Sequence, residues 1–281
     1  MAGNRNLDRH SCQLRSSDSA CIRSIMIVGE RCSGTNWLTN LCATNFKIAV
    51  HNKAGSGTFG WKHNPQGLED EELLAKYRDN TLFIFITRNV CDWIEHFYKS
   101  PWHVPRNVLK TRETFLMHEP WVCCDGNDGT GEEIDDIDRT TGQRFRNLLE
   151  LRAKKHAHWR SLCVTGGAQD EKPVDALLYH EWVRYEDLLQ NPASFLSNLQ
   201  KKYALTPVAD KWNTLEHNYK GLNRKLFSAR KTKTNSFHFR CARNARKWSA
   251  ALLTYVKENV DWAVERDLGY CDFAQELLAN S

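Results

Sequence analysis

The sequence lacks the features that mark several common classes of protein. No stretch approaches the roughly 18 apolar residues of a membrane span, and the first ten residues contain no apolar segment of a signal peptide. The ten cysteines include no Cys-x-x-Cys pair of the kind found in zinc sites, and no carboxylate cluster has metal-binding spacing. No internal repeat is visible. These absences predict a soluble cytoplasmic protein with reduced cysteines and no bound metal.

The chain also lacks a large excess of charge of either sign. The formal net charge of +5 suits an acidic ligand, but it is too mild to imply nucleic acid without a concentrated basic face. With 281 residues, 41% of them hydrophobic, the chain can bury a full core in one large domain. We expect a flexible N-terminus over residues 1–22 and one α/β domain over 23–275. Periodicity is lost over 101–141, which predicts a functional or disordered insertion there.

The most informative segment runs from Ile25 to Cys42. It places a short apolar strand, a glycine-bracketed turn and an amphipathic helix in immediate succession. The turn from Gly29 to Gly34 has the spacing of a nucleotide P-loop, in which backbone N–H groups and a helix N-terminus bind an anion. Thr35 and Asn36 stand where an NTP-hydrolysing loop carries lysine and a hydroxyl residue. The loop is therefore predicted to bind a phosphate without the usual γ-phosphate lysine and magnesium ligand.

A second strand-to-helix unit follows. The continuous apolar run over 81–87 is typical of a parallel strand covered on both faces, and Asn89 is a suitable N-cap for a helix over 90–98. Arg88 then lies where open α/β sheets bind ligands, beyond the carboxyl ends of the strands. We expect a three-layer, P-loop-type parallel sheet flanked by helices. Further strands are predicted over 46–50, 58–62 and 176–184, and further helices over 142–163, 186–203 and 246–268.

Four motifs together resemble the sulfotransferase family, which transfers a sulfuryl group from 3′-phosphoadenosine 5′-phosphosulfate (PAPS). The first two are Gly-Glu-Arg-Cys-Ser-Gly-Thr-Asn-Trp-Leu in the loop and Thr-Arg-Asn-Val-Cys-Asp-Trp after the second strand. The later two are Val-Arg-Tyr-Glu-Asp-Leu-Leu-Gln-Asn-Pro and Glu-Arg-Asp-Leu-Gly-Tyr. The resemblance covers residues 25–100 and 142–200. Each motif alone is weak, whereas their order and spacing are fairly specific.

The resemblance implies a set of residues around the 5′-phosphosulfate and the adenine. The loop contacts would come from Arg31, Cys32, Ser33, Gly34, Thr35 and Asn36. The family usually carries a cation directly before Ser-Gly-Thr, where this chain has Cys32, so Arg31 would act from one place earlier. Trp37 matches the position whose ring stacks on adenine. The alternatives are that Arg31 only pairs at the surface and that Trp37 is a core side chain.

The 3′-phosphate is expected to bind Arg88, whose guanidinium has the fork geometry that a terminal phosphate requires. His96 stands where the family usually carries a serine partner, although a histidine on a helix surface is an equal alternative. Tyr185 could line the nucleotide pocket, and the acidic residues after it favour the start of a helix. Arg230 is the nearest match to the family's late Arg-Lys-Gly contact, and the alternative is a solvated basic loop.

For catalysis, the acceptor must lose a proton while it attacks sulfur. His63 resembles the family's base, and a neutral imidazole suits this role near pH 7. Lys62 would stabilise the bridging and sulfuryl oxygens, together with Arg31 on the leaving phosphate. The alternative for His63 is a structural histidine. No metal is required, because transfer depends on positioning and charge stabilisation.

The sequence thus predicts sulfotransfer from PAPS to a hydroxyl or amine of a small acceptor, with the 101–141 insertion on the acceptor side. No nucleic-acid or membrane partner is expected, and the oligomeric state stays open. One alternative is a P-loop nucleotide kinase or phosphotransferase, which needs a lysine and Mg²⁺ ligands that the loop lacks. The other is a non-catalytic polyanion or nucleic-acid binder that uses the basic stretch over 215–246.

Overall fold

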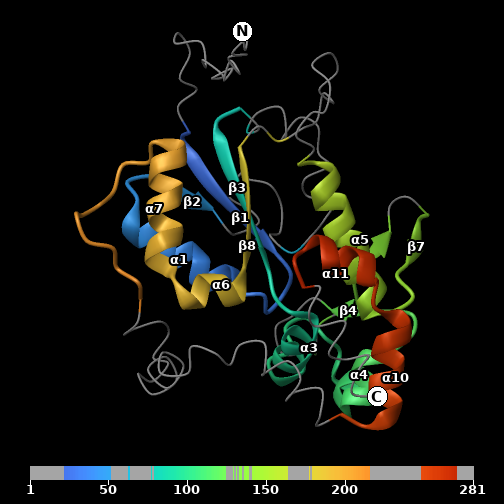
Figure 1. The fold of residues 1–281 in the computed structure, drawn as a ribbon. Helices are drawn as coiled ribbons and strands as arrows, with labels where there is room; N and C mark the ends of the chain where they lie inside the picture. The colour runs from blue at the N-terminus through green and yellow to red at the C-terminus, as the bar shows by residue number, and fades with distance from the viewer. Residues whose placement is uncertain are drawn as a thin grey trace, which may run out of the picture.

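A four-stranded parallel sheet lies at the centre of the computed structural model (Figure 1). The strand order is β2-β1-β3-β8, with β1 at Ser24–Gly29, β2 at Ala49–His51, β3 at Thr81–Thr87 and β8 at His180–Arg184. The described residues are 22–51, 63, 77, 79–124, 129, 131, 133–134, 136–138, 141–163, 177, 179–215 and 248–270. The predicted strand over 58–62 lies outside them. Both inner strands, β1 and β3, are buried along their whole length, as expected for apolar strands covered on two faces.

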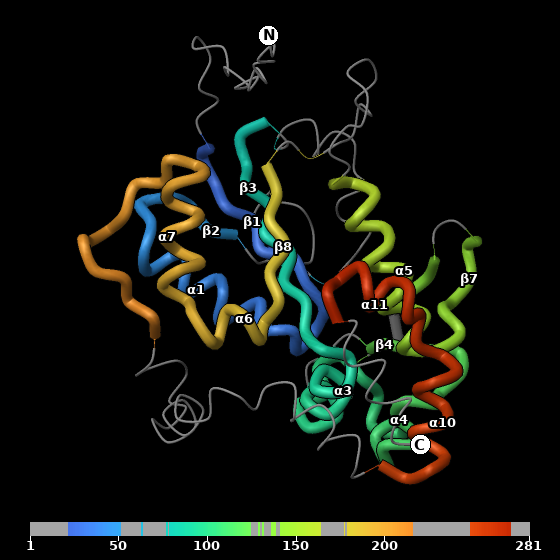
Figure 2. Tube along the Cα trace, viewed as in Figure 1, coloured from blue at the N-terminus to red at the C-terminus, as the bar shows by residue number. Residues whose placement is uncertain are grey.

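Helices cover both faces of this sheet (Figure 2). On one face, α1 (Thr35–Asn45), α6 (Tyr185–Gln190) and α7 (Pro192–Tyr203) pack on Ile25, Ile27, Ile84 and Ile86. On the other, Trp159 of α5 (Leu148–Ser161) packs on Met26, Val28, Phe83 and Phe85. The helix α11 (Trp262–Asp267) packs against α5. The predicted α/β class, a parallel sheet flanked by helices, is therefore confirmed.

A second apolar cluster extends beyond the carboxyl end of β3. It is built around α3 (Val90–Lys99), where Asn89 caps the helix as predicted by accepting from the N–H of Cys91. The other elements of this region are η2 (Arg106–Leu109), α4 (Arg112–Leu116), β4 (Cys123–Cys124), β5 (Glu133–Ile134), β6 (Ile137–Asp138), β7 (Gln143–Arg144) and α10 (Ala250–Asn259). Phe115 and Trp121 are fully buried against α3. The described parts of the 101–141 segment therefore contribute to the core.

Several predicted boundaries are wrong, and capping explains those of the helices. The helix predicted over 142–163 starts only at Leu148, because Asn147 accepts hydrogen bonds from the first-turn N–H groups. The helix predicted over 246–268 is two helices, and Asp261 caps the second. The helices predicted over 186–203 are α6 and α7, which are separated by Asn191. The strands predicted over 46–50 and 176–184 are shorter, and Phe46 instead pairs with Pro207 in an isolated bridge.

Helix length and hydropathy bear on membrane association. Within the described part of the chain, no helix is both long enough and apolar enough to cross a membrane.

Candidate functional site

The turn after β1 leads directly into the N-terminus of α1. Ser33 closes the turn by donating from its hydroxyl and its N–H to the carbonyl of Glu30, at 2.7 and 3.2 Å. Cys32 and Gly34 have positive φ angles of 64° and 104°, and Gly34, the N-cap residue of α1, has no side chain to cap the helix. A Cβ atom at Gly34 would lie 2.5 Å from Cδ2 of Tyr185, so only glycine fits there. The dipole of α1 makes its N-terminus suitable for an anion.

Arg88 lies directly against this turn. Its Nη1 donates to the carbonyl of Cys32 at 3.2 Å, and its guanidinium carbon is 4.6 Å from the centre of the Tyr185 ring. Tyr185 in turn contacts the buried Trp37 edge to face, with ring centres 6.0 Å apart. The structure thus brings together the turn, Arg88, Tyr185 and Trp37 at the carboxyl edge of the sheet.

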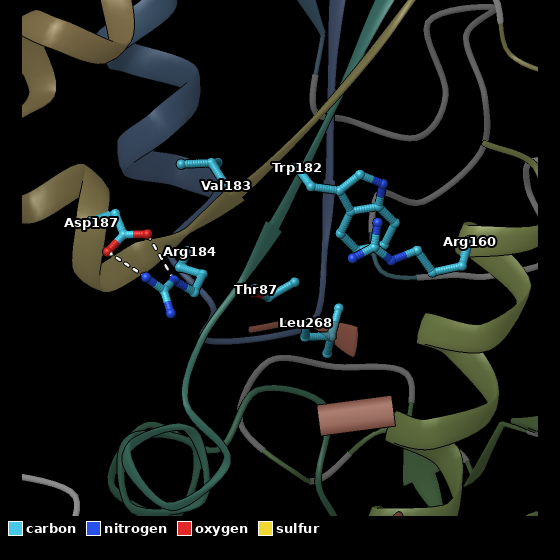
Figure 3. Close-up of a pocket in the computed structure, with 7 residues that line it drawn as sticks. All are labelled: Thr87, Arg160, Trp182, Val183, Arg184, Asp187 and Leu268. Carbon is cyan, nitrogen blue, oxygen red and sulfur yellow. Dashed lines mark hydrogen bonds and ion pairs between the residues drawn. The ribbon is translucent and has the colours of Figure 1, made fainter. Parts of the chain in front are cut away.

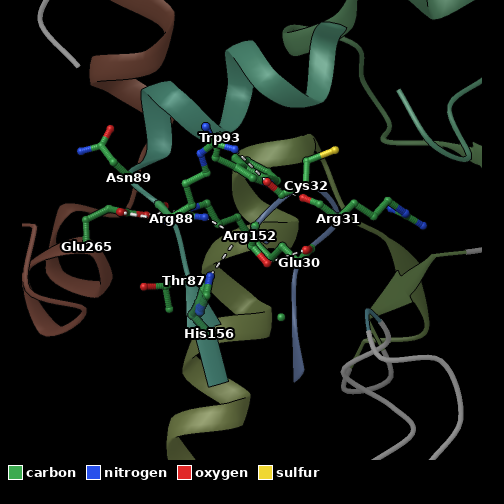
Figure 4. Close-up of polar contacts among 12 residues, drawn as sticks. Glu30, Arg31, Cys32, Thr87, Arg88, Asn89, Trp93, Arg152, His156 and Glu265 are labelled. Carbon is green, nitrogen blue, oxygen red and sulfur yellow. Dashed lines mark hydrogen bonds and ion pairs between the residues drawn. The ribbon is translucent and has the colours of Figure 1, made fainter. Parts of the chain in front are cut away.

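Arg31 takes a different direction from Arg88 (Figure 4). Its Nη2 donates to Sγ of Cys123 at 3.0 Å, and its Nη1 is 3.7 Å from Oδ2 of Asp136. The indole N–H of Trp93 donates to the Arg31 carbonyl at 2.7 Å and holds the backbone of the turn. Arg31 is buried and not paired at the surface. Its charge is engaged with the segment that carries Cys123 and Asp136.

His63 contacts the last residue of β1. Its Nδ1 lies 2.6 Å from the carbonyl oxygen of Gly29, and the side chain is buried. Because a carbonyl oxygen only accepts hydrogen bonds, Nδ1 must carry the proton in the neutral ring, which leaves the lone pair on Nε2. This tautomer can take up a proton at Nε2. Of the other predicted site residues, His96 is exposed on α3, whereas Lys62 and Arg230 lie outside the described residues.

A buried charged network below the turn was missed by the sequence reasoning. The carboxylate of Glu30 pairs with Nη1 of Arg152 and lies 3.0 Å from Nε2 of His156. Nε and Nη2 of Arg152 donate to the two oxygens of Glu265 at 2.6 and 3.1 Å. All four side chains are almost inaccessible to solvent. The network fixes Glu30, the first residue of the turn, to α5 and α11 (Figure 4).

The network shifts the ionisation of its members. Burial by itself raises the pKa of Glu30, but Arg152 and His156 outweigh it and hold the pKa below its ordinary value. Burial likewise disfavours the charged form of Arg152, but Glu265 and Glu30 raise the pKa of the guanidinium. Both groups are therefore charged at neutral pH. The one signal in the sequence is the spacing of Arg152 and His156, four residues apart within the apolar stripe of α5.

A pocket of about 260 Å³ lies near the same end of the sheet, between β8 and α5 (Figure 3). The two arginine side chains that line this pocket, Arg160 and Arg184, already have partners. Arg160 lies over the Trp182 ring at 4.2 Å and pairs with Asp267, while Arg184 forms two hydrogen bonds with Asp187. Among the described residues, no group of three or more His, Cys, Asp or Glu side chains is placed to hold a metal ion.

Comparison of the chain with models of protein families, with curated proteins and with solved structures finds no match. Function is therefore inferred from the residues and their geometry.

The positive φ of Cys32 gives a first prediction. Glycine adopts this conformation without strain, whereas any side chain is disfavoured there. Cys32→Gly and Cys32→Ala both remove the thiol that donates to the carbonyl of Ser100. We expect the glycine variant to be more stable than the alanine variant by about 1 kcal/mol, measured by urea unfolding. Equal stability would show that the turn is relaxed at this residue.

Proposed function

We propose that this protein is a PAPS-dependent sulfotransferase of the P-loop type that acts on a hydroxyl or amine of a small acceptor. The observation that carries the proposal is the position of Arg88. Nη1 of Arg88 lies 3.2 Å from the Cys32 carbonyl oxygen in the glycine-bracketed turn, and the two elements follow neighbouring parallel strands. Two anion-binding elements side by side suit a nucleotide with phosphates on both sides of its ribose.

In this proposal the turn binds the 5′-phosphosulfate. Gly34, Thr35 and Asn36 would supply backbone N–H groups, and Thr35 a hydroxyl, at the start of α1, whose dipole favours the negative charge, while Ser33 closes the turn. Arg88 holds the 3′-phosphate, and Tyr185 supplies aromatic surface beside it. Trp37 is buried in the core and supports the Tyr185 ring from behind. PAPS is the only co-substrate, and no metal takes part in the proposed transfer.

His63 acts as the general base. Its Nε2 takes the acceptor proton as the acceptor oxygen or nitrogen forms a bond to sulfur. The bond between sulfur and the bridging phosphate oxygen breaks, and 3′,5′-adenosine bisphosphate leaves with the negative charge. The N–H groups of the turn stabilise this charge. Arg31 adds to this effect once its guanidinium leaves Cys123 and Asp136.

The proposed setting is the cytoplasm. All six cysteines among the described residues are free thiols, which supports a reducing compartment. The proposed partner is the small acceptor alone, without nucleic acid or membrane. The basic stretch over 215–246, which a polyanion binder would use, lies outside the described residues except for Leu215.

Thermal stabilisation tests the proposal against a kinase. We expect 3′,5′-adenosine bisphosphate to raise the melting temperature without magnesium, and Mg-ATP to have little effect. Stabilisation by Mg-ATP alone would overturn the proposal in favour of a phosphotransferase. Salt-sensitive binding of RNA or heparin, without a bisphosphate effect, would favour a polyanion binder. A mass-spectrometric screen of hydroxyl and amine acceptors with labelled PAPS then identifies the substrate.

Arg88→Ala gives the second prediction. Loss of a charged partner for phosphate is expected to weaken bisphosphate binding about 10- to 100-fold in titration calorimetry. Arg23→Ala is the matched control, because Arg23 is exposed at the opposite, amino end of β1. Its affinity should equal that of the wild type. Unchanged affinity in the Arg88 variant would remove this residue from the site.

A further inference from the structure

One peptide group next to the site is held from both sides. It joins Arg88 to Asn89, directly after β3. Its carbonyl accepts a hydrogen bond from Nη2 of Arg152 at 2.9 Å, and its N–H donates to Oε1 of Glu186 at 2.9 Å. The two partners come from α5 and α6, which lie on opposite faces of the sheet. Rotation of this peptide would break both contacts.

The partners are themselves fixed. The second oxygen of Glu186 accepts from the hydroxyl of Tyr270 at 3.0 Å, and that hydroxyl lies 3.1 Å from Oγ1 of Thr87. Arg152 is buried, binds Glu265 and lies 4.9 Å from the centre of the Trp93 ring. Movement of Arg152 would break its contacts with Glu30 and Glu265. Movement of Glu186 would break its contact with Tyr270.

The same guanidinium also reaches the turn. Arg152 pairs with Glu30 through Nη1 while its Nη2 holds the carbonyl of Arg88. One buried group therefore fixes the spacing between the turn and the backbone of Arg88 (Figure 4). Fixing groups before a ligand arrives lowers the entropy lost on binding.

We infer that Glu186 and Arg152 are positioning residues that orient Arg88 and thereby set the preference for a nucleotide with a 3′-phosphate over one without it. The inference rests on the proposed function. In this inference Glu186 acts by fixing the peptide group after Arg88, because its carboxylate accepts a hydrogen bond from the N–H of Asn89. Arg88 itself contacts the phosphate, and Glu186 does not.

The test compares the affinities for 3′,5′-adenosine bisphosphate and 5′-AMP by titration calorimetry. Glu186→Ala removes the acceptor for the Asn89 N–H, and the ratio of the two affinities should fall about 10-fold. Glu186→Gln keeps an oxygen at this place and should retain most of the ratio. Asp187→Ala is the matched control, because Asp187 lies in the first turn of the same helix but pairs with Arg184. Its ratio should equal that of the wild type.

The ratio separates positioning from a purely structural role. General destabilisation lowers both affinities equally and leaves the ratio unchanged, and that result for Glu186→Ala would overturn the inference. In an Arg88→Ala background, Glu186→Ala should cause no further fall in the ratio. A further fall would mean that Glu186 acts independently of Arg88 and would also overturn it.

Two further outcomes are informative. If the wild type shows no preference for the bisphosphate, the proposed function fails and the inference fails with it. If the wild type prefers the bisphosphate and Glu186→Ala keeps that preference, only the inference fails. Should Glu186→Ala not fold, Tyr270→Phe serves instead, because it removes only the hydroxyl that holds Glu186. It should lower the same ratio by about 3-fold, and an unchanged ratio would overturn the inference.

Discussion

Arg152→Met is expected to lower the free energy of unfolding by about 3–5 kcal/mol, because it leaves buried carboxylates without a counter-charge. Glu30 and Glu265 both pair with this guanidinium, and the side chains of all three residues are 4% exposed or less. Methionine fills a similar volume, so the loss reflects charge more than packing. Chemical denaturation followed by tryptophan fluorescence measures the change.

Arg160→Met is the matched control for this prediction. Arg160 lies on the same helix α5 and also pairs with a carboxylate, that of Asp267, at 2.8 Å. These side chains are 35% and 63% exposed, and such pairs contribute no more than about 1 kcal/mol. Glu265→Gln should recover part of the loss in the Arg152→Met background, since it removes one unpaired charge. Equal effects of Arg152→Met and Arg160→Met would contradict the buried-network interpretation.

His63→Ala is expected to lower sulfotransfer turnover by about 100-fold or more while bisphosphate affinity stays unchanged. The reason is loss of the base at Nε2, whose lone pair is set by the contact between Nδ1 and Gly29. Turnover is measured with labelled PAPS and the acceptor identified by the screen. Full activity of the variant would show that His63 has only a structural role.

Two variants separate the base from the backbone contact. His63→Asn can still donate to the Gly29 carbonyl but offers no basic nitrogen, so it should be as slow as the alanine variant. His180→Ala is the matched control, because His180 also contacts a backbone carbonyl through Nδ1. This distance, to the carbonyl oxygen of Leu177, is 3.1 Å. His180 begins β8 at the opposite end of the sheet, and its replacement should not change turnover.

The inner strands were the most predictable part of the fold. The bounds of β3 agree with the apolar run over 81–87, because a strand buried on both faces has to be apolar at every position. Asn89 could be identified as an N-cap because capping depends on the residue type directly before a helix, which the sequence gives. The 101–141 segment was not predictable in the same way. Its core residues, such as Phe115 and Trp121, pack against elements distant in the sequence, and their spacing follows neither the helix nor the strand period.

Two elements of the site, the turn after β1 and Arg88, could also be predicted from the sequence. The glycine-bracketed turn and Arg88 follow two strands, and parallel strands bring their carboxyl ends to one edge. The network below was not visible, because charged residues on a helix are ordinarily read as solvent-facing. Arg152 is buried because Glu30 and Glu265 compensate its charge. These partners lie far from Arg152 in the sequence, and ion pairs between such distant residues cannot be inferred from a single sequence.

The order of Glu30, Arg152 and Glu265 along the chain affects how the protein matures on the ribosome. When α5 emerges, Arg152 has only one of its two carboxylate partners, and Tyr270 has not yet been synthesised to hold Glu186. The turn after β1 is made early but acquires its final support late. The geometry of the turn therefore becomes complete only when the C-terminal helices have been synthesised and have packed.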